Sequence, residues 1–195
     1  MYRKSKRSSV VAVALAIGLN LSGWPASAQN VEEKTQVCAG CHGADGKPVD
    51  KTFPVIWGQQ AGYLYFQLRD FKRGDRKNDV MQPIAAMLER QDMLDIADYF
   101  SKKPWPDLGQ PRAPKEVSDR ALSANHSVGC TGCHLDHFQG DGTVPRLAGM
   151  SREYLTKTMT DFRTRARGNN PGMSDLMLAT SPDDLAALAE YLAGL

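Results

Sequence analysis

The pattern Cys-x-x-Cys-His occurs twice in this chain, as CAGCH at residues 38–42 and within CTGCHLDHFQGDG at residues 130–142. In both places two cysteines are three positions apart, and a histidine directly follows the second cysteine. Cysteine pairs at this spacing can bind a metal, form a redox disulfide or attach a haem covalently. The compartment of the protein and the rest of the sequence decide among these chemistries.

Residues 1–28 have the three parts of a secretory signal peptide. Four basic residues lie within residues 1–9, residues 10–21 (VVAVALAIGLNL) are apolar, and residues 26–28 (ASA) form a small-residue cleavage site. The apolar run is about a dozen residues, short of the roughly 20 that a membrane-spanning helix needs. We therefore expect cleavage after Ala28 and a periplasmic protein, with an uncleaved N-terminal anchor as the less favoured alternative.

Charge changes sign when this segment is removed. The full chain has 24 basic and 22 acidic residues, and the signal segment takes four of the basic ones. The mature chain is therefore slightly acidic. Nucleic-acid binding, which requires a clustered basic face, is not expected.

Export places the cysteines in an oxidising compartment, where disulfides are common. A disulfide within one Cys-x-x-Cys closes a short loop and stabilises a fold little, because loop-closure entropy grows with loop length. A redox pair would need a βαβ pattern, and zinc ribbons do not place a histidine after each pair at this separation. In an exported protein the pattern is the attachment signature of c-type haem. We therefore predict two covalently bound haem c groups, one at Cys38, Cys41 and His42 and one at Cys130, Cys133 and His134.

The similarity between the two halves extends beyond these motifs, which are 92 residues apart. At an offset of 91 the matched pairs are Pro54 and Pro145, Gly58 and Gly149, Tyr63 and Tyr154, Leu64 and Leu155, Asp70-Phe71 and Asp161-Phe162, Arg76 and Arg167, and Asn78 and Asn169. The offset returns to 92 where Ile96-Ala97-x-Tyr99 meets Leu188-Ala189-x-Tyr191. One compensating shift of a single residue indicates a tandem duplication.

The repeat also selects a second iron ligand in each half. Haem iron bound by histidine often takes methionine as its other axial ligand. The methionines after the signal segment are Met81, Met87, Met93, Met150, Met159, Met173 and Met177. At an offset of 92 only Met81 meets another methionine, Met173, and both lie 39 residues after the motif histidine. We predict Met81 and Met173 as axial ligands, with Met177 as the closest competitor and flexible core filling as the alternative role.

Apolar periodicity predicts an all-α chain, with no convincing alternating strand. Helices are expected at residues 31–38, 62–72, 90–100, 152–163 and 181–192. Polar, Gly/Asn-rich loops at 74–80 and 166–172 should bring the methionines over the haems. Four prolines and one glycine in residues 102–114 predict a semi-rigid extended linker. The expected organisation is a first domain at 29–101, a linker at 102–117 and a second domain at 118–195.

The sequence resembles the dihaem cytochromes c of the c-four type. The features that carry the resemblance are the two Cys-x-x-Cys-His motifs, the Pro-x-x-x-Gly and Tyr-Leu segments, the Asp-Phe helix end, the loop methionine and the Ala-x-Tyr closing helix. The resemblance covers residues 31–195. It implies two tandem class I cytochrome c domains joined by a Pro-rich linker, related by a pseudo-twofold axis, with facing haems. It also implies that the segments holding Pro54 and Pro145 pack against the motif histidines and orient their rings.

The same resemblance implies periplasmic electron transfer between a quinol-oxidising complex or a dehydrogenase and a terminal oxidase. The partners would be redox proteins, and any membrane association would be peripheral and through them. Six-coordinate iron has no open position for substrate, so a carrier rather than an enzyme is expected, and methionine ligation raises the potential relative to two histidines. A dihaem subunit docked permanently on a dehydrogenase is the alternative.

Two features depart from the family pattern. Residues 116–129 leave little room for an N-terminal helix in the second domain. His137 stands where the first half has Asp45, and His126 stands where it has Lys34. A small dihaem enzyme with one labile ligand would use one of these histidines, but their lack of counterparts favours exposed loop positions.

Basic residues gather at positions 69–77 and again at 163–167, and these stretches include Arg76 and Arg167. A docking surface for acidic partners, a solvated loop and pairing with haem propionates each explain them. The sequence does not distinguish among the three.

Overall fold

The computed structural model describes residues 31–195, so the expected signal peptide and its cleavage site lie outside the described residues. The described part is all-α, as predicted, and its β pairing is limited to one isolated bridge between Asp141 and Val144. Its helices are α1 (Val31–His42), α2 (Ala61–Arg73), α3 (Met81–Ala86), α4 (Arg90–Ser101), α5 (Lys115–Val128), α6 (Thr131–His134), α7 (Arg152–Arg163), α8 (Pro171–Ala179) and α9 (Pro182–Ala193).

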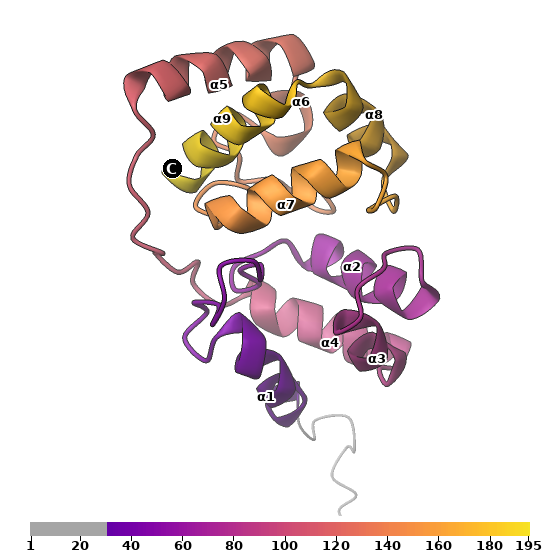
Figure 1. Cartoon of the computed structure of the whole chain (residues 1–195). Helices are drawn as coiled ribbons and strands as arrows, with labels where there is room; N and C mark the ends of the chain where they lie inside the picture. Colours follow the sequence, from indigo (N-terminus) through magenta and orange to yellow (C-terminus); the bar gives the residue numbers. More distant parts are fainter. Residues whose placement is uncertain (1–30) are drawn as a thin grey trace, which may run out of the picture.

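The helices form two bundles, α1–α4 and α5–α9, joined by an extended segment that runs along one side of the molecule (Figure 1). The order of elements repeats: α5 and α6 correspond to α1, α7 to α2, α8 to α3, and α9 to α4. In the first bundle α4 packs on α1 and α2, and in the second α9 packs on α5 and α7. The tandem repeat read from the sequence is therefore also a repeat of helix packing.

Local signals explain where several helices begin and end. Ser181 accepts a hydrogen bond from the backbone N–H of Asp184 (3.1 Å), and Pro182 occupies the first turn of α9. Helix α7 has the same kind of start, because the hydroxyl of Ser151 accepts from the N–H of Tyr154 (3.1 Å). Helix α2 ends at Gly74, whose φ of 78° lies in the left-handed region that favours glycine.

Three expectations about elements are corrected. The second domain does have an N-terminal helix: α5 starts at Lys115, directly after Pro114, and so takes the last three residues of the expected linker. In the first half α1 continues through the motif to His42 instead of ending at Cys38. The loop expected at 166–172 ends at residue 170, because α8 starts at Pro171, whereas the loop expected at 74–80 is confirmed, since α3 starts at Met81.

Each bundle has its own apolar core. In the second bundle it includes Leu155, Leu188 and Leu192, and in the first it consists of Leu64, Ile96, Ala97 and Phe100. Within residues 31–195 no helix is both long enough and apolar enough to cross a membrane.

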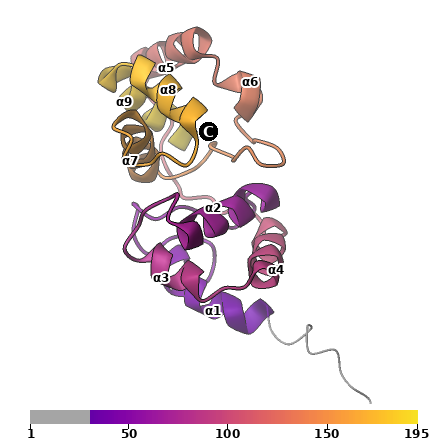
Figure 2. The same cartoon turned by 90° about the vertical axis from the view of Figure 1, so that its right-hand side faces the viewer.

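The bundles contact each other through equivalent residues, with α2 and α7 on their facing sides in both views (Figures 1 and 2). Arg76 Nη2 donates to the hydroxyl of Tyr154, and Arg167 Nη2 donates to the hydroxyl of Tyr63, both at 3.2 Å. The two bonds are related by the sequence offset of 91. Reciprocal contacts of this kind are the pattern of a twofold interface.

The linker takes part in this interface through Trp105. A Cβ on Gly58 would lie 2.9 Å from the backbone N of Trp105, and a Cβ on Gly149 would lie 2.9 Å from its Nε1. These glycines are equivalent in the repeat and have φ of 64° and 75°. The guanidinium of Arg146 covers the indole at 4.6 Å. Trp105 therefore packs tightly against both halves, and side chains at the two glycines would displace it.

Candidate haem sites

The first cysteine pair lies on the last turns of α1. Cys38 and Cys41 are one helical turn apart, which places their side chains on the same face. In the second half α5 ends at Gly129, and Cys130 and Cys133 then lie in the separate short turn of α6. The two cysteine pairs thus have the same spacing in sequence but lie in different local structures.

These thiols do not resemble those of a redox disulfide. None of the four cysteines is in a disulfide. Burial raises the pKa of Cys38 to about 11 and also raises the pKa of Cys130. Catalytic thiols of Cys-x-x-Cys enzymes have lowered pKa values, because the thiolate is the reactive form. The environment of the cysteines therefore argues against thiol–disulfide exchange.

The motif histidines are buried, His42 being 8% exposed and His134 6%. Nδ1 of His42 lies 2.8 Å from the carbonyl oxygen of Pro54, and Nδ1 of His134 lies 2.9 Å from that of Pro145. A carbonyl oxygen only accepts, so Nδ1 carries the proton and Nε2 has its lone pair available. Burial lowers the pKa of both histidines and keeps them neutral. Neutral imidazole with its second nitrogen oriented in this way is the form that binds metals.

The predicted methionines are each held by an asparagine three residues earlier. Asn78 Oδ1 accepts from the backbone N–H of Met81 (2.9 Å), and Asn170 Oδ1 accepts from that of Met173 (3.1 Å). This geometry corrects the sequence alignment, because the counterpart of Asn78 is Asn170 and not Asn169. The offset thus returns to 92 between Arg76 and Asn78, so that the asparagine and the methionine of each half share one register.

Both histidines and all four cysteines line one continuous cavity of about 710 Å³, together with the predicted methionines Met81 and Met173. All eight residues predicted for the two sites therefore line the same cavity. Met177 lines the same cavity and is more deeply buried, at 3% exposed. It packs in the core of the second bundle, which is the alternative role considered for it.

Polar residues at the junction of the two bundles also line the cavity. We call them the interface network: Tyr63, Gln67, Asp70, Arg76, Tyr154, Arg167 and Asn169. Among the described residues neither arginine of this network forms an ion pair. A haem carries two carboxylates, so an apolar cavity with unneutralised guanidinium groups on its wall fits that group in shape and charge. From the sequence, the basic stretches that contain these arginines could equally form a docking surface, a solvated loop or a pairing with haem propionates. The position of Arg76 and Arg167 on the cavity wall favours the last of these.

The extra histidines lie elsewhere. His126 on α5 and His137 after α6 are exposed, and neither lines the cavity. Within residues 31–195 no group of three or more His, Cys, Asp or Glu side chains is arranged to hold a metal ion. Both histidines are exposed, as expected, but only His137 lies in a loop, because His126 is in the last turn of α5.

Two cysteine pairs, each followed by a neutral, oriented imidazole and sharing an apolar cavity with methionines, define a c-type cytochrome with two haems. Comparison with known families agrees, since the family described as Cytochrome c matches residues 33–102.

Relatives extend this similarity over the whole chain. A cytochrome c4 of Azotobacter vinelandii is 32% identical, with 94% of this chain and 97% of the relative aligned. A protein of Stutzerimonas stutzeri named thiosulfate dehydrogenase electron acceptor is 38% identical, covering 80% of this chain and 77% of its own. The crystal structure of reduced recombinant cytochrome c4 from Pseudomonas stutzeri superposes with a TM-score of 0.73 at 31% identity, covering 83% of this chain and 95% of that one.

The chain belongs to the cytochrome c4 family. It is a dihaem electron-transfer protein of two class I cytochrome c domains, with two covalently bound haem c groups, and not an enzyme.

Proposed function

We propose that the chain carries single electrons in the periplasm between a quinol-oxidising complex or a dehydrogenase and a terminal oxidase. The signal-like residues 1–28 and the family membership support this location and role. The mature protein would consist of domains at 29–101 and 118–195 with a linker at 102–117. The observation that carries the proposal is the Nδ1 to proline carbonyl bond of His42 and His134, which prepares Nε2 of both rings to bind iron.

The proposed haem-binding residues are the thioether-forming Cys38, Cys41, Cys130 and Cys133, with His42, Met81, His134 and Met173 as axial ligands. Bound haem supplies one-electron redox chemistry. The side chains hold it, exclude water and tune its potential. Because both axial positions would be filled, substrate would have no open position on iron, which is the requirement of a carrier.

An optical spectrum of the purified protein in both redox states tests this proposal. We expect low-spin spectra for two haems and a sulfur–iron charge-transfer band in the oxidised form. High-spin bands, or rapid binding of carbon monoxide by the reduced protein, would show an open or labile position and contradict the pure-carrier role.

One relative favours a second, narrower role. The similarity to a thiosulfate dehydrogenase electron acceptor suggests a dehydrogenase as the electron donor. Thiosulfate together with a thiosulfate dehydrogenase should then reduce this protein rapidly, whereas thiosulfate alone should not. Co-purification with a larger dehydrogenase subunit would indicate a docked subunit, and isolation as a lone cytochrome would indicate a free carrier.

A further inference from the structure

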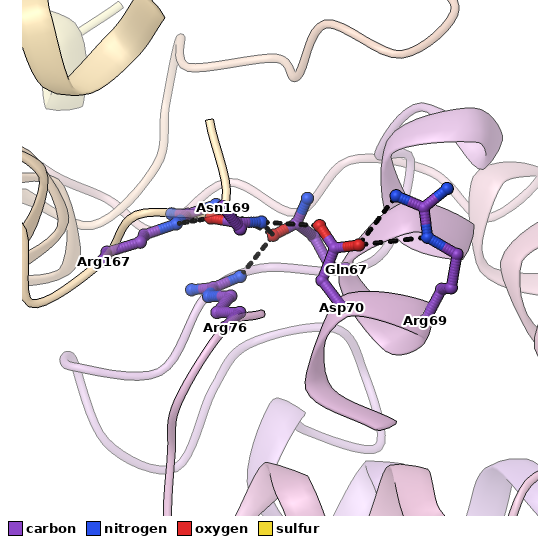
Figure 3. A network of polar contacts seen from close by, with 6 residues as sticks. All are labelled: Gln67, Arg69, Asp70, Arg76, Arg167 and Asn169. Carbon is purple, nitrogen blue, oxygen red and sulfur yellow. Dashed lines mark hydrogen bonds and ion pairs between the residues drawn. The ribbon is translucent and has the colours of Figure 1, made fainter. Parts of the chain in front are cut away.

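Two arginines, one from each half, share a single acceptor at the junction of the bundles. Oε1 of Gln67 accepts from Arg76 Nη1 and from Arg167 Nη2, both at 2.9 Å. It also accepts from Asn169 Nδ2 at 3.1 Å. Figure 3 shows Gln67 at the centre of these contacts, between residues of the two halves. One neutral amide oxygen thus receives three hydrogen bonds, two of them from cations.

The two arginines also share two local contacts. The backbone N–H of Arg76 donates to the carbonyl of Asp70, and that of Arg167 to the carbonyl of Asp161. Each guanidinium covers the phenylalanine that follows that aspartate, at 4.6 Å for Phe71 and 4.3 Å for Phe162. The structure therefore holds two like charges close together by the same local device in each half.

The acceptor is present in one half only. At the offset of 91, the position of Gln67 is occupied by Thr158 in the second half. Asp70, the carboxylate of the interface network, is 4% exposed and already receives Arg69 and Asn169. Like charges repel more strongly in a low-dielectric interior than in water. Without Gln67 the two guanidiniums would lose the one atom that binds both of them.

The shared acceptor also lies between the two sites. Gln67, Arg76 and Arg167 line the cavity that contains both cysteine pairs. A change in charge at one site therefore acts on a group that is hydrogen-bonded to the other half. Charged groups joined through buried hydrogen bonds influence each other more than exposed groups at the same separation do.

We infer that Gln67 is a positioning residue: it holds Arg76 and Arg167 together at the junction and thereby fixes the two haem sites relative to each other. This inference rests on the proposed haem sites and concerns their coupling, not their ligands. Loss of the shared acceptor weakens the docking of the halves, which Trp105 and the two tyrosine–arginine contacts also maintain. A carboxylate in its place keeps the acceptor while adding a negative charge felt by both sites.

Three variants of the haem-loaded full chain test it. Gln67→Leu removes the acceptor at similar size, and Gln67→Glu keeps an acceptor and adds charge. Gln60→Leu is the matched control, because Gln60 also bridges the halves but donates only to the backbone carbonyls of Gln139 and Gly140 (3.1 and 3.2 Å). Urea unfolding reports on docking of the halves, and a redox titration reports on the potentials of both haems.

We expect Gln67→Leu to unfold at a lower urea concentration than the parent and than Gln60→Leu, because only Gln67 binds both guanidiniums, whereas Gln67→Glu should unfold close to the parent. In Gln67→Glu both reduction potentials should shift downward together, because the negative charge stabilises the oxidised state at both sites. Gln60→Leu should keep one transition and unchanged potentials. The inference is overturned if Gln67→Leu unfolds like Gln60→Leu, or if Gln67→Glu moves only one potential. Failure of the haem proposal would look different, since the parent protein would then lack two six-coordinate haem spectra.

Discussion

Asn170 provides the sharpest test of how the chain presents a methionine to iron. Its side chain caps α8 by accepting the N–H of Met173 at 3.1 Å. Replacing an N-cap asparagine with alanine costs about 1 kcal/mol. If that cost falls on the segment that carries the ligand, release of Met173 becomes about fivefold more favourable, since 1.36 kcal/mol corresponds to tenfold.

The assay follows the sulfur–iron charge-transfer band of the oxidised protein during heating. In Asn170→Ala the second site should release its methionine at a lower temperature than in the parent, so about half of the band should disappear early. Asn170→Asp keeps the capping oxygen and should restore the parent behaviour. Ser181→Ala is the matched control, because Ser181 caps α9 at the same distance of 3.1 Å but carries no predicted ligand. An equal early loss of the band in Ser181→Ala, or none in Asn170→Ala, would show that the Asn170 cap does not hold Met173 in place.

Three further predictions concern the second ligand, the linker and the interface. Met173→Leu should abolish the half of the sulfur–iron charge-transfer band that belongs to the second site. Met177→Leu should keep that band and lower the free energy of unfolding by less than about 1.5 kcal/mol. The opposite result would show that Met177 is the ligand. Trp105→Ala should lower the free energy of unfolding in urea by about 2–3 kcal/mol, less than a fully buried tryptophan because the ring is only partly buried. Trp105→Phe keeps a ring and removes the unpartnered Nε1–H, so it should stay close to the parent. Burial alone would raise the pKa of Tyr154, but Arg76 and Arg167 lower it to about 7 from 10.0. The folded state thus favours the phenolate, and its stabilisation is complete above pH 10 and lost as pH falls through 7. Tyr154→Phe should remove this rise in unfolding free energy between pH 7 and 10, and an unchanged pH profile would contradict the assignment.

Much of the site could be predicted because its signals are local. The Cys-x-x-Cys-His spacing is a short covalent pattern, and the duplication allowed one half to be checked against the other. The same comparison selected Met81 and Met173 from seven candidates, and the structure places both on the cavity that contains the motifs. The alignment was wrong at Asn78, because a repeated Asn at 169 and 170 makes two registers equally good in letters. Only the capping bond to the methionine distinguishes them.

The missing helix of the second domain was a similar error. Residues 116–129 looked too short for this helix, because a proline-rich linker precedes them and Cys130 follows them. The segment forms α5 because Ala121 and Ala124 are small enough to pack on α9, where both are buried. Tertiary packing of one narrow face outweighs a weak local pattern.

The class of protein and the tandem repeat could be recognised without the structure, and so could the proposed haem-attachment residues, since each depends on a few neighbouring residues or on the spacing of two copies. Tertiary structure alone decided how the copies meet. Arg167 and Gln67 are 100 residues apart, and no local pattern indicates that they share a hydrogen bond. Such contacts depend on how two folded bundles dock, which is set by the shape and charge of complete surfaces and not by any short stretch of chain.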